Sequence, residues 1–508
     1  MATQEQARNF NDVRRALHAY ADDAGVALVK RAYDFASRAH GDQRRLTGDL
    51  YITHPIATAV TLAEMKMSPA VVAAGLLHDV PEDTAVTIDQ VRAEFGDDIA
   101  SLVNGITKVG KVKYRGVERY VENLRKMFLV MAEDVRVIFI KFADRLHNLE
   151  TLEVVPEPKR KRVALESLDI YAPIANRLGM GDIRGRLEDA AFRYVDPEAC
   201  VRVGALIEKF CSKKEDYIER LSKAMQQELA AAGIQAISVH GRRKHVYSLY
   251  KKLLRHENDI TKIHDLLAVR AIVKDVADCY AALGIIHQKW KPLKGRIKDY
   301  IAQPKPNGYQ SLHTTVFADE GEIIEVQIRT PEMHEANEYG VAAHWQYTES
   351  GKRSQQPHPD QLAWVKEFSR IQKDIEDHKE FLQRLESLKV DVFQNRIFVF
   401  TPQGDVIDLP EDATPVDFAY AIHTEVGNHC TGARINDEIV TLNRPLKSGD
   451  VVEIMTDKKR SHPSGDWLKF VKTHNAKNKI RAEVKSPAEW LLSLLPSAPK
   501  KPGKSKDA

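Results

Sequence analysis

The segment GLLHDVPEDT, residues 75–84, ends an apolar run with one histidine and three acidic side chains. The preceding residues, 71–77, are apolar or glycine, which predicts a buried helix. His78, Asp79, Glu82 and Asp83 follow where that helix should end. Ionisable groups are costly to bury without partners. The pattern therefore leaves two interpretations, a helix end that reaches solvent or a metal site.

Two other stretches of the N-terminal region carry residues that can join this group. YITHPIATAV contributes His54, and KFADRLHNLETL contributes Asp144, His147 and Asn148. Neutral imidazoles and carboxylates can hold a divalent ion that keeps positions open for water and substrate. A mixed nitrogen and oxygen set suits Mn²⁺, with zinc and iron as alternatives. A single histidine is better explained as structural, so the predicted metal site depends on the three stretches together.

Glu82 and Asp83 lie one helical turn beyond the His-Asp pair, and Pro81 is expected to disturb the helix between them. They are not needed as ligands, so their predicted role is to position or deprotonate an attacking water. His147 is expected to pack or to orient a ligand.

The chain has 508 residues, a length that suggests roughly three domains. Its composition, 43% hydrophobic and 29% charged, is that of an ordinary globular protein. The net charge of +3 indicates no partner by itself. The N-terminus lacks a signal-peptide pattern, and no apolar run is long enough to span a bilayer. The four cysteines are scattered without a Cys-x-x-Cys pair. We therefore expect free thiols, no zinc ribbon, no membrane and a cytoplasmic location.

Hydrophobic periodicity divides the chain into segments. Helical spacing dominates the N-terminal region, where the β-branched run at 135–140 is interpreted as buried helix because of its length and neighbours. Strand and helix patterns then alternate, and a polar loop and charged spacer helix precede a hairpin, a capped helix and further strands. The predicted domains are an all-α domain at 1–195, an α/β domain at 196–345 with linking helices near 150–235, a loop and spacer at 346–392, a small α+β module at 393–457, and the start of a helical region with a disordered basic tail at 458–508.

A second candidate site lies in the α/β region. GRRKHVYSLYKK, residues 241–252, places basic residues where a turn enters a helix, which suits phosphate, although a solvated basic helix explains the stretch when taken alone. DLLAVR places Asp265 at the start of a buried strand, where Mg²⁺ is a suitable partner. In EVQIRT, strand periodicity directs Glu325, Gln327 and Arg329 to one face. A carboxylate there can bind metal or take a proton from a hydroxyl.

The segment between these strands supplies further candidates. GRIKDYIAQPKPNGYQSLHTTV contributes Arg296, Lys298, Lys305, Asn307, Tyr309 and His313. Tyr309 follows a flexible Asn-Gly pair and can stack on a purine. Phosphate-binding residues beside a carboxylate base indicate group transfer between nucleotides, and neither a Walker A nor a kinase motif set is present.

THP, LLHDVPEDT and ADRLHN together resemble the HD-type hydrolase of the RelA/SpoT homologue family, whose long Rel-type members are bifunctional alarmone enzymes. The resemblance implies removal of the 3′-pyrophosphate of (p)ppGpp with Mn²⁺. The implied roles are metal ligands for His54, His78, Asp79 and Asp144, water handling for Glu82 and Asp83, and nucleotide contacts for Arg45, Asn148 and Thr151. Leu46 stands where the family commonly has lysine. That departure bears on one phosphate or ribose contact and leaves the metal centre untouched.

RRKHVYSLYKK, NGYQSLHT and EVQIRT closely resemble the synthetase domain of the same family, an α/β nucleotidyltransferase-like fold. The resemblance implies pyrophosphate transfer from ATP to the 3′-oxygen of GDP or GTP. Asp265 would bind Mg²⁺, Glu325 would serve as ligand and base, and Tyr309 would stack on guanine. The implied substrate contacts are Arg242, Lys244, Ser248, Lys252, Arg296, Lys298, Lys305, Asn307, His313, Gln327 and Arg329. RIKD, residues 296–299, matches the basic form of a signature that is acidic in synthetase-only relatives.

IFVFTPQGDVIDLP and DFAYAIHTEVGNHC resemble a TGS domain, a small ubiquitin-like α+β module shared with threonyl-tRNA synthetase. The resemblance implies contact with tRNA or the ribosome, with His423 at the family position that approaches the tRNA 3′ end. Without the resemblance, His423 would be an ordinary core or surface histidine. Long family members continue into zinc-binding and ACT-type segments, which this sequence does not contain.

The sequence is compatible with three candidate functions. The first is a bifunctional alarmone synthetase and hydrolase, in which one activity must be off while the other is on, with the linking helices as the coupling element. The second is a synthetase with a structural HD region, which the intact His-Asp set disfavours. The third is an RNA-binding regulatory protein, in which the metal set and Glu325 would have no role.

Overall fold

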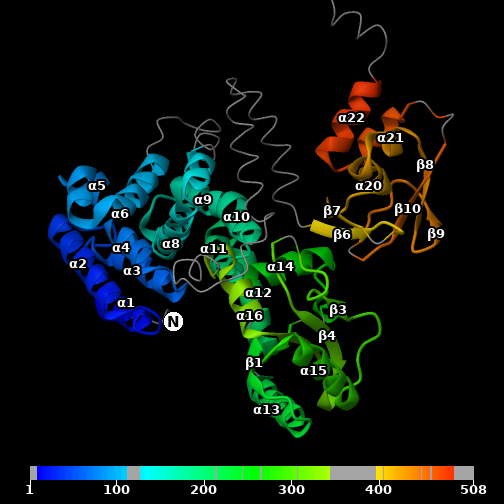
Figure 1. Cartoon of the computed structure of the whole chain (residues 1–508), viewed down its shortest axis with the longest axis horizontal. Helices are drawn as coiled ribbons and strands as arrows, with labels where there is room; N and C mark the ends of the chain where they lie inside the picture. The colour runs from blue at the N-terminus through cyan, green and yellow to red at the C-terminus, as the bar shows by residue number, and fades with distance from the viewer. Residues whose placement is uncertain are drawn as a thin grey trace, which may run out of the picture. The chain divides into compact units, whose positions relative to one another are not determined.

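The structure is a computed structural model that describes residues 8–110, 126–211, 214–242, 244–263, 266–305, 307–343, 396–403, 405–447, 449–457, 460 and 462–484. Its contacts divide the chain into two compact units, Met1–Glu376 and Asp377–Ala508 (Figure 1). The predicted spacer at 346–392 and the predicted disordered tail beyond 484 lie outside the described residues.

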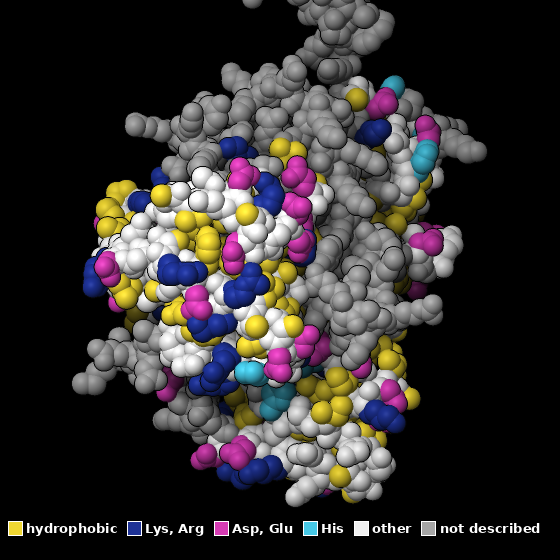
Figure 2. Space-filling view, turned by 60° about the vertical axis from the view of Figure 1, so that its left-hand side comes forward, with side chains coloured by type: hydrophobic (Ala, Val, Ile, Leu, Met, Phe, Trp, Pro, Cys, Tyr) yellow, Lys and Arg dark blue, Asp and Glu magenta, His cyan; other side chains and the backbone are white. Residues whose placement is uncertain are grey.

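Surface charge on the first unit is mixed. On the face shown in Figure 2, Lys and Arg side chains lie among Asp and Glu side chains, in keeping with the small net charge. Among the described residues, every helix is too short or too polar to cross a lipid bilayer.

Within the described residues, the first unit opens with a run of helices. They are α1 (Phe10–Leu17), α2 (Asp23–His40), α3 (Thr53–Glu64), α4 (Pro69–Leu77), α5 (Val80–Asp83), α6 (Ile88–Gly110) and α8 (Arg136–Glu150). The helical N-terminal region is therefore confirmed, and the β-branched run at 135–140 forms a buried helix as predicted.

Helices α3 and α4 lie at the centre of this region, because nearly every side chain of both is buried. Gly75 allows them to approach closely, since a Cβ there would lie 2.5 Å from Cδ1 of Leu62. Helix α4 ends at Leu77, so His78 emerges at the buried end of an apolar helix. Helix α5 begins two residues later with Pro81 in its first turn, where a missing N–H is tolerated.

A second run of helices leads towards the sheet. It consists of η1 (Leu152–Val154), α9 (Glu157–Glu166), η2 (Ser167–Tyr171), α10 (Ala172–Arg177), α11 (Gly181–Val195), α12 (Pro197–Cys211) and α13 (Glu215–Ala231). The segment η2 is a π-helical turn, a feature found frequently at functional sites. Arg145 of α8 lies 4.2 Å from the centroid of the Tyr171 ring, and its Nη2 donates to the Tyr171 hydroxyl at 2.9 Å. This contact ties α8 to the π-helical turn.

The sheet of the first unit has five described strands in the order β1-β2-β5-β4-β3. The strands are β1 (Ala236–Arg242), β2 (Ala268–Val273), β3 (Lys298–Asp299), β4 (Leu312–Phe317) and β5 (Ile323–Arg329), with the short turn η5 (Asp319–Gly321) between the last two. Strands β2 and β5 are parallel, and the other neighbouring pairs are antiparallel. Strand β2 is buried along its whole length. The mixed sheet confirms the α/β prediction.

Further helices complete the α/β region. They are α13, α14 (Val246–Arg255), η4 (Ile260–Lys262), α15 (Val276–Lys289) and α16 (Pro331–Tyr339). One apolar core joins α13 and α15 to the sheet, through residues such as Met225, Ile286 and Val269.

The corner between α10 and α11 packs directly against the α/β region. The backbone N–H of Val341 donates to the Leu178 carbonyl at 2.9 Å, and Nδ2 of Asn307 donates to the Asn176 carbonyl at 3.2 Å. Gly340 has φ +57, and a Cβ there would lie 2.0 Å from the Leu178 oxygen. Only glycine satisfies both the backbone angle and the close approach.

The second unit is a small α+β module. Its elements are β6 (Arg396–Phe400), β7 (Val406–Pro410), α20 (Pro415–Ile422), α21 (Thr424–Asn428), β8 (Cys430–Ile435), β9 (Glu438–Val440), β10 (Val452–Thr456), η6 (Gly465–Lys469) and α22 (His474–Val484). Strands β6 and β7 form the predicted hairpin, and a parallel bridge between Phe400 and Val451 connects the hairpin to the sheet β10-β8-β9.

The capped helix predicted in TPVDFAYAIHTEVG, residues 414–427, is present as α20 with a capping box at Thr414, but it ends at Ile422. The backbone at His423 is extended, with φ −162 and ψ 147, and separates α20 from α21. Nδ1 of His423 accepts a hydrogen bond from the Glu425 N–H at 3.2 Å, so this side chain caps the second helix. A side-chain cap of this kind competes with continuation of the helix.

Asp417 fastens the segment that follows the module to α20. Its carboxylate is fully buried and accepts hydrogen bonds from the N–H and hydroxyl of Thr414, the N–H of Lys472, and the N–H and hydroxyl of Thr473. Trp467 and Ile480 share an apolar core with α20. Residues 462–484 therefore belong to the fold of the second unit.

Replacement of this carboxylate should destabilise the second unit. Asp417→Ala leaves several buried donors without an acceptor, so we expect a loss of about 3 kcal/mol or more. Native-state hydrogen exchange of amides in 396–484 measures it. Asp466→Ala, which removes an exposed carboxylate from the same unit, is the control and should leave exchange unchanged. Equal exchange in the two variants would contradict the role of Asp417.

Candidate metal centre and nucleotide site

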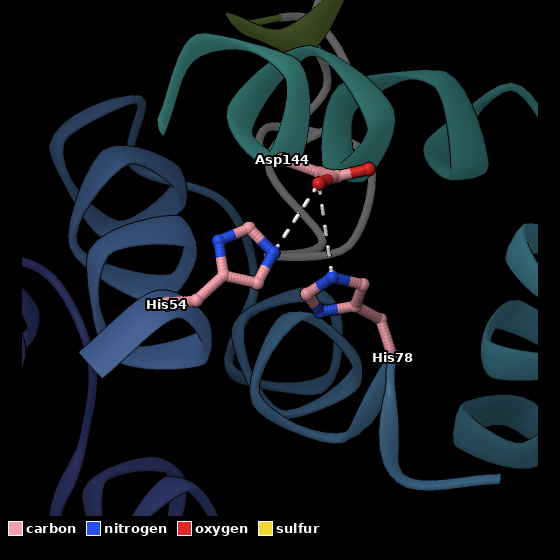
Figure 3. A group of neighbouring side chains, drawn as sticks. All are labelled: His54, His78 and Asp144. Carbon is pink, nitrogen blue, oxygen red and sulfur yellow. Dashed lines mark ion pairs between the residues drawn. The ribbon is translucent and has the colours of Figure 1, made fainter. Parts of the chain in front are cut away.

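Three side chains from different parts of the helical region converge in Figure 3. His54 comes from α3, His78 follows α4, and Asp144 comes from α8, and their ligand atoms all lie within 4.8 Å of one another. Oδ1 of Asp144 lies 3.3 Å from Nε2 of His54 and 4.0 Å from Nε2 of His78. Asp79 lies beside them, with Oδ2 3.4 Å from His54 Nε2 and Oδ1 3.1 Å from His78 Nε2. The structure thus brings together all four predicted ligands.

His78 has the tautomer that a metal ligand needs. Its Nδ1 lies 2.7 Å from the Gly75 carbonyl, which can only accept, so Nδ1 carries the hydrogen and donates it. Nε2 is buried and has no hydrogen-bond partner among the described residues. A buried lone pair that faces two carboxylates fits a divalent cation, and a backbone carbonyl that fixes the second nitrogen is typical of metal-bound histidine.

His147 orients His54 from the other side. The Nδ1 atoms of the two rings lie 2.8 Å apart, so one must donate to the other. Burial, together with His54 and Arg45, lowers the pKa of His147 to about 3, so His147 is neutral at neutral pH. With Nε2 of His54 directed at the carboxylates, its Nδ1–H donates to His147. This arrangement matches the expectation that His147 packs or orients a ligand.

Asp144 is held through both oxygens. Lys141 Nζ lies 3.1 Å from Oδ2, and Asn148 Nδ2 donates to Oδ1 at 2.5 Å. Burial would raise the pKa of Asp144, but Lys141 and the two histidines outweigh it and hold that pKa well below its usual range. The carboxylate is therefore ionised and oriented, as a ligand must be.

The predicted nucleotide contacts of this site form one network beside the metal group. Arg45 donates from Nη2 to Oδ1 of Asn148 at 2.9 Å and from Nη1 to Oγ1 of Thr151 at 3.3 Å. Leu46, at the tip of the same loop, is 76% exposed.

Glu82 and Asp83 are exposed on α5, and Oδ2 of Asp83 accepts a hydrogen bond from the Tyr51 hydroxyl at 2.5 Å.

A second group of polar side chains lies on the sheet. Strand register places Glu325 and Gln327 on β5 and His313 opposite Gln327 on β4. Oε1 of Glu325 accepts from Gln327 Nε2 at 2.7 Å and lies 3.4 Å from Nδ1 of His313. Nε2 of His313 lies 2.7 Å from the Tyr309 hydroxyl. The predicted base, the predicted stacking residue and a predicted phosphate ligand are therefore neighbours.

Lys305 completes this group. Its Nζ lies 4.5 Å from the centroid of the Tyr300 ring and 4.9 Å from that of Tyr309. Burial, together with Lys298 and Arg184, lowers the pKa of Lys305 to about 8. A lysine that is partly desolvated and close to other cations gains charge stabilisation when an anion arrives.

Two parts of the predicted substrate site, the N-terminus of α14 and Asn307, make hydrogen bonds within the protein. At the N-terminus of α14, Asp189 accepts a hydrogen bond from the Tyr247 N–H at 2.9 Å and pairs with His245 at 2.8 Å, so this N–H already has an acceptor within the protein. Asn307 uses its side chain within the loop, where Oδ1 accepts from the Tyr309 N–H at 3.2 Å in addition to the contact with α10. Asp189 and Asn307 therefore both make hydrogen bonds within the protein at this place.

Arg329 lies deep in the domain. It is 1% exposed, and its guanidinium nitrogens have no hydrogen-bond partner among the described residues. The nearest carboxylate is Glu338, at 3.6 Å, which also pairs with Arg270 at 3.0 Å. Two buried arginines thus share one carboxylate and leave a local excess of positive charge. They lie beside the nucleotide group, which consists of Glu325, His313, Tyr309 and Lys305.

The remaining predicted contacts lie around this group. Arg242 ends β1 and is exposed, and Lys244, Ser248 and Lys252 lie at the start and along α14, partly buried. Arg296 and Lys298 are exposed near β3. Asp265, the predicted Mg²⁺ ligand, lies outside the described residues. In the second unit, His423 is exposed between α20 and α21.

Comparisons with known proteins identify three domains. The HD domain family model matches residues 32–181, the region found in RelA / SpoT proteins matches 241–352, and the TGS domain matches 397–456.

Curated relatives extend along most of the chain. It is 46% identical over 470 residues to a GTP pyrophosphokinase of Myxococcus xanthus, a match that covers 92% of this chain and 61% of the relative. It is 47% identical over 458 residues to a guanosine-3′,5′-bis(diphosphate) 3′-pyrophosphohydrolase of Aquifex aeolicus, covering 90% and 64%. It is 44% identical over 476 residues to the bifunctional (p)ppGpp synthase/hydrolase RelA of Mycobacterium tuberculosis, covering 92% and 63%.

The domain order and these identities define a multidomain protein with an HD domain, a synthetase-type domain and a TGS domain. The chain belongs to the RelA/SpoT family. It spans about three fifths of the length of the curated relatives.

The motifs did not lead us to predict two side chains that contact the metal group. Lys141 precedes Asp144 by three residues, and a helical reading of that segment could have placed it on the same face. Tyr51 precedes His54 by three residues at the start of α3. Its contact with α5 could not be inferred from spacing, because it joins segments far apart in the sequence.

Metal binding can be tested by thermal stability and metal content. Mn²⁺ at about a hundred times its dissociation constant should stabilise metal-free protein by about 2.7 kcal/mol. His78→Ala should lose this gain and the bound metal, because it removes the unpartnered Nε2. His18→Ala, at an exposed histidine of the same region, is the control. Equal stabilisation and metal content in both variants would contradict the site.

Proposed function

We propose that the chain is a bifunctional alarmone enzyme. It transfers pyrophosphate from ATP to the 3′-hydroxyl of GDP or GTP, and it hydrolyses the 3′-pyrophosphate of (p)ppGpp at a separate site. One observation carries the proposal, namely that a buried His-Asp group and a Glu-His-Tyr-Lys group lie in different parts of the same unit. Relatives that are named for synthesis, for hydrolysis or for both activities support the proposal.

In the hydrolase half, His54, His78, Asp79 and Asp144 hold a divalent cation, for which we propose Mn²⁺. When bound, the cation supplies charge neutralisation and makes an attacking water more acidic. Glu82 and Asp83, on the exposed helix α5, position that water and take its proton.

Substrate recognition in this half falls to three residues. Arg45, Asn148 and Thr151 bind the nucleotide, and their mutual hydrogen bonds set its distance from Asp144. A guanidinium held in this way recognises phosphate or a base edge with defined geometry.

In the synthetase half, Glu325 takes the proton from the 3′-hydroxyl of the acceptor nucleotide. Gln327 orients this carboxylate, while Tyr309 stacks on guanine. Lys305 and His313 bind phosphate, together with Arg242, Lys244, Ser248, Lys252, Arg296, Lys298 and Arg329. Developing negative charge on the transferred group is stabilised by such preorganised cations. Mg²⁺ bound by Asp265 and Glu325 is part of the proposal, and Asp265 lies outside the described residues.

The TGS domain is the proposed contact to tRNA or the ribosome. His423 is exposed, and its cap on α21 fixes the ring at the junction of two helices. A surface ring fixed in this way can stack on an unpaired base.

The two activities oppose each other, so we propose that they exclude each other in time. A continuous set of contacts runs between the sites. Arg145, next to Asp144 in sequence, holds Tyr171 of the π-helical turn, and α10 then leads to the corner that packs on Asn307. A shift of this helix would alter both sites at once, which is how each nucleotide could bias a shared equilibrium.

Two substitutions should separate the activities. Asp79→Ala should abolish ppGpp hydrolysis with Mn²⁺ and spare synthesis from ATP and GDP with Mg²⁺, and Glu325→Gln should do the reverse. Nucleotide chromatography measures both reactions. Absence of pyrophosphate transfer by the unmodified protein would end the proposal for synthesis. Synthesis without any hydrolysis would favour the alternative of a synthetase with a structural HD domain.

The lowered pKa of Lys305 predicts a pH dependence of nucleotide binding. The group is charged below its pKa of about 8 and neutral above it. The KM for the phosphate-bearing substrate should therefore rise above pH 8, by up to about tenfold per pH unit for one proton. Lys305→Arg keeps the charge and should remove the rise, whereas Lys289→Arg, on the exposed end of α15, should not. The same rise in Lys305→Arg would exclude Lys305 as its source.

A further inference from the structure

Tyr51 connects the metal group to the acidic helix α5. Its hydroxyl lies 2.5 Å from Oδ2 of Asp83 and 3.0 Å from Oδ2 of Asp79. A phenol has one hydrogen to donate, and an ionised carboxylate can only accept. The hydroxyl therefore serves one carboxylate at a time, and the shorter distance is to Asp83. When Asp79 gives its lone pairs to a cation, Asp83 becomes the better acceptor.

The loop that carries Tyr51 makes a second contact with Asp83, through Gln43. Tyr51 stacks on His40, with ring centroids 4.6 Å apart and planes inclined by 17°. Nδ1 of His40 lies 2.9 Å from Oε1 of Gln43, and Nε2 of Gln43 donates to the Asp83 carbonyl at 2.9 Å. The N–H of Tyr51 in turn donates to the Gln43 carbonyl at 2.8 Å. Both the side chain and the backbone of Asp83 are thus fixed by the end of α2 and the loop after it.

Asp83 needs such support because of its location. Helix α5 has four residues, and Asp83 is exposed at its end. An exposed carboxylate on a single turn rotates among several rotamers, and a group that must meet a water at hydrogen-bond distance loses efficiency when it does so. The Tyr51 hydroxyl selects one rotamer and relates it to Asp79.

We propose that Tyr51 is a positioning residue for the hydrolase reaction, because its hydroxyl holds the Asp83 carboxylate at a fixed place relative to the ligand Asp79. The inference rests on the proposed hydrolase function and deepens it. The phenol does not contact the reacting atoms, and it acts through Asp83. The same loop carries Arg45 to Asn148, so one loop sets the position of both the nucleotide contact and the acid.

Tyr51→Phe tests this proposal, because it removes only the hydroxyl. We expect kcat for ppGpp hydrolysis to fall about 10- to 100-fold, the range for loss of a partner that orients an active-site group. KM, Mn²⁺ content and ATP-dependent synthesis should be unchanged. Tyr20→Phe is the matched control, because its hydroxyl donates to the Met67 carbonyl at 2.7 Å in the same helical region. It should leave kcat unchanged.

A double-mutant cycle identifies the route of the effect. In an Asp83→Ala background, Tyr51→Phe should cause no further loss of kcat, because the residue to be positioned is gone. Additive losses, or a lowered Mn²⁺ content in Tyr51→Phe, would overturn the proposal in favour of an action through Asp79.

The outcomes separate this inference from the proposed function. Absence of hydrolysis by the unmodified protein removes the hydrolase function itself, whereas an active protein with equal kcat in Tyr51→Phe removes only the role of Tyr51. If Tyr51→Phe loses synthesis together with its fold, Gln43→Ala carries the test, since it removes the second contact with Asp83 at an exposed position. An unchanged kcat in that variant would overturn the proposal.

Discussion

The burial of α4 is the constraint on which the N-terminal half depends. A helix without a solvent face cannot place a polar residue along its length, so polar chemistry is confined to its end. His78 and Asp79 lie at that end, where the chain turns into α5. Their neighbours come from α3 and α8, which pack on α4, so the same apolar contacts that stabilise the fold bring the imidazoles and carboxylates together. Fold and site are thus consequences of one packing arrangement.

Electrostatics differs between the two sites in a way that suits their proposed reactions. The metal group places buried, ionised carboxylates beside imidazoles, which favours a divalent ion, while Lys141 holds Asp144 through its other oxygen. The nucleotide group has an excess of cations, seen in the two arginines that share Glu338 and in Lys305, whose pKa is lowered by burial first and then by Lys298 and Arg184. Such a site favours phosphate groups, because each bound anion relieves repulsion already present in the protein.

Sequence alone could indicate the ligands but not their support. His54, His78, Asp79 and Asp144 were predicted because few residue types bind metal and their motifs are specific, and the structure places them together. The strand alternation at β5 likewise placed Glu325 beside Gln327.

Contacts between distant segments could not be read in this way. The contact of Tyr51 with Asp83 and the cap of Asp189 on α14 join residues 32 and 58 positions apart, and nothing in local spacing specifies them. The break at His423 depends on a side-chain cap that competes with a helical pattern, so the sequence pattern predicted the capped helix but not its end at Ile422.

The most direct test of the account is anomalous diffraction at the manganese edge from crystals of the metal-loaded protein. We expect a peak within bonding distance of Nε2 of His54, Nε2 of His78 and a carboxylate oxygen of Asp144. Metal-loaded crystals without a peak at that place, or with these side chains turned away from one another, would contradict it.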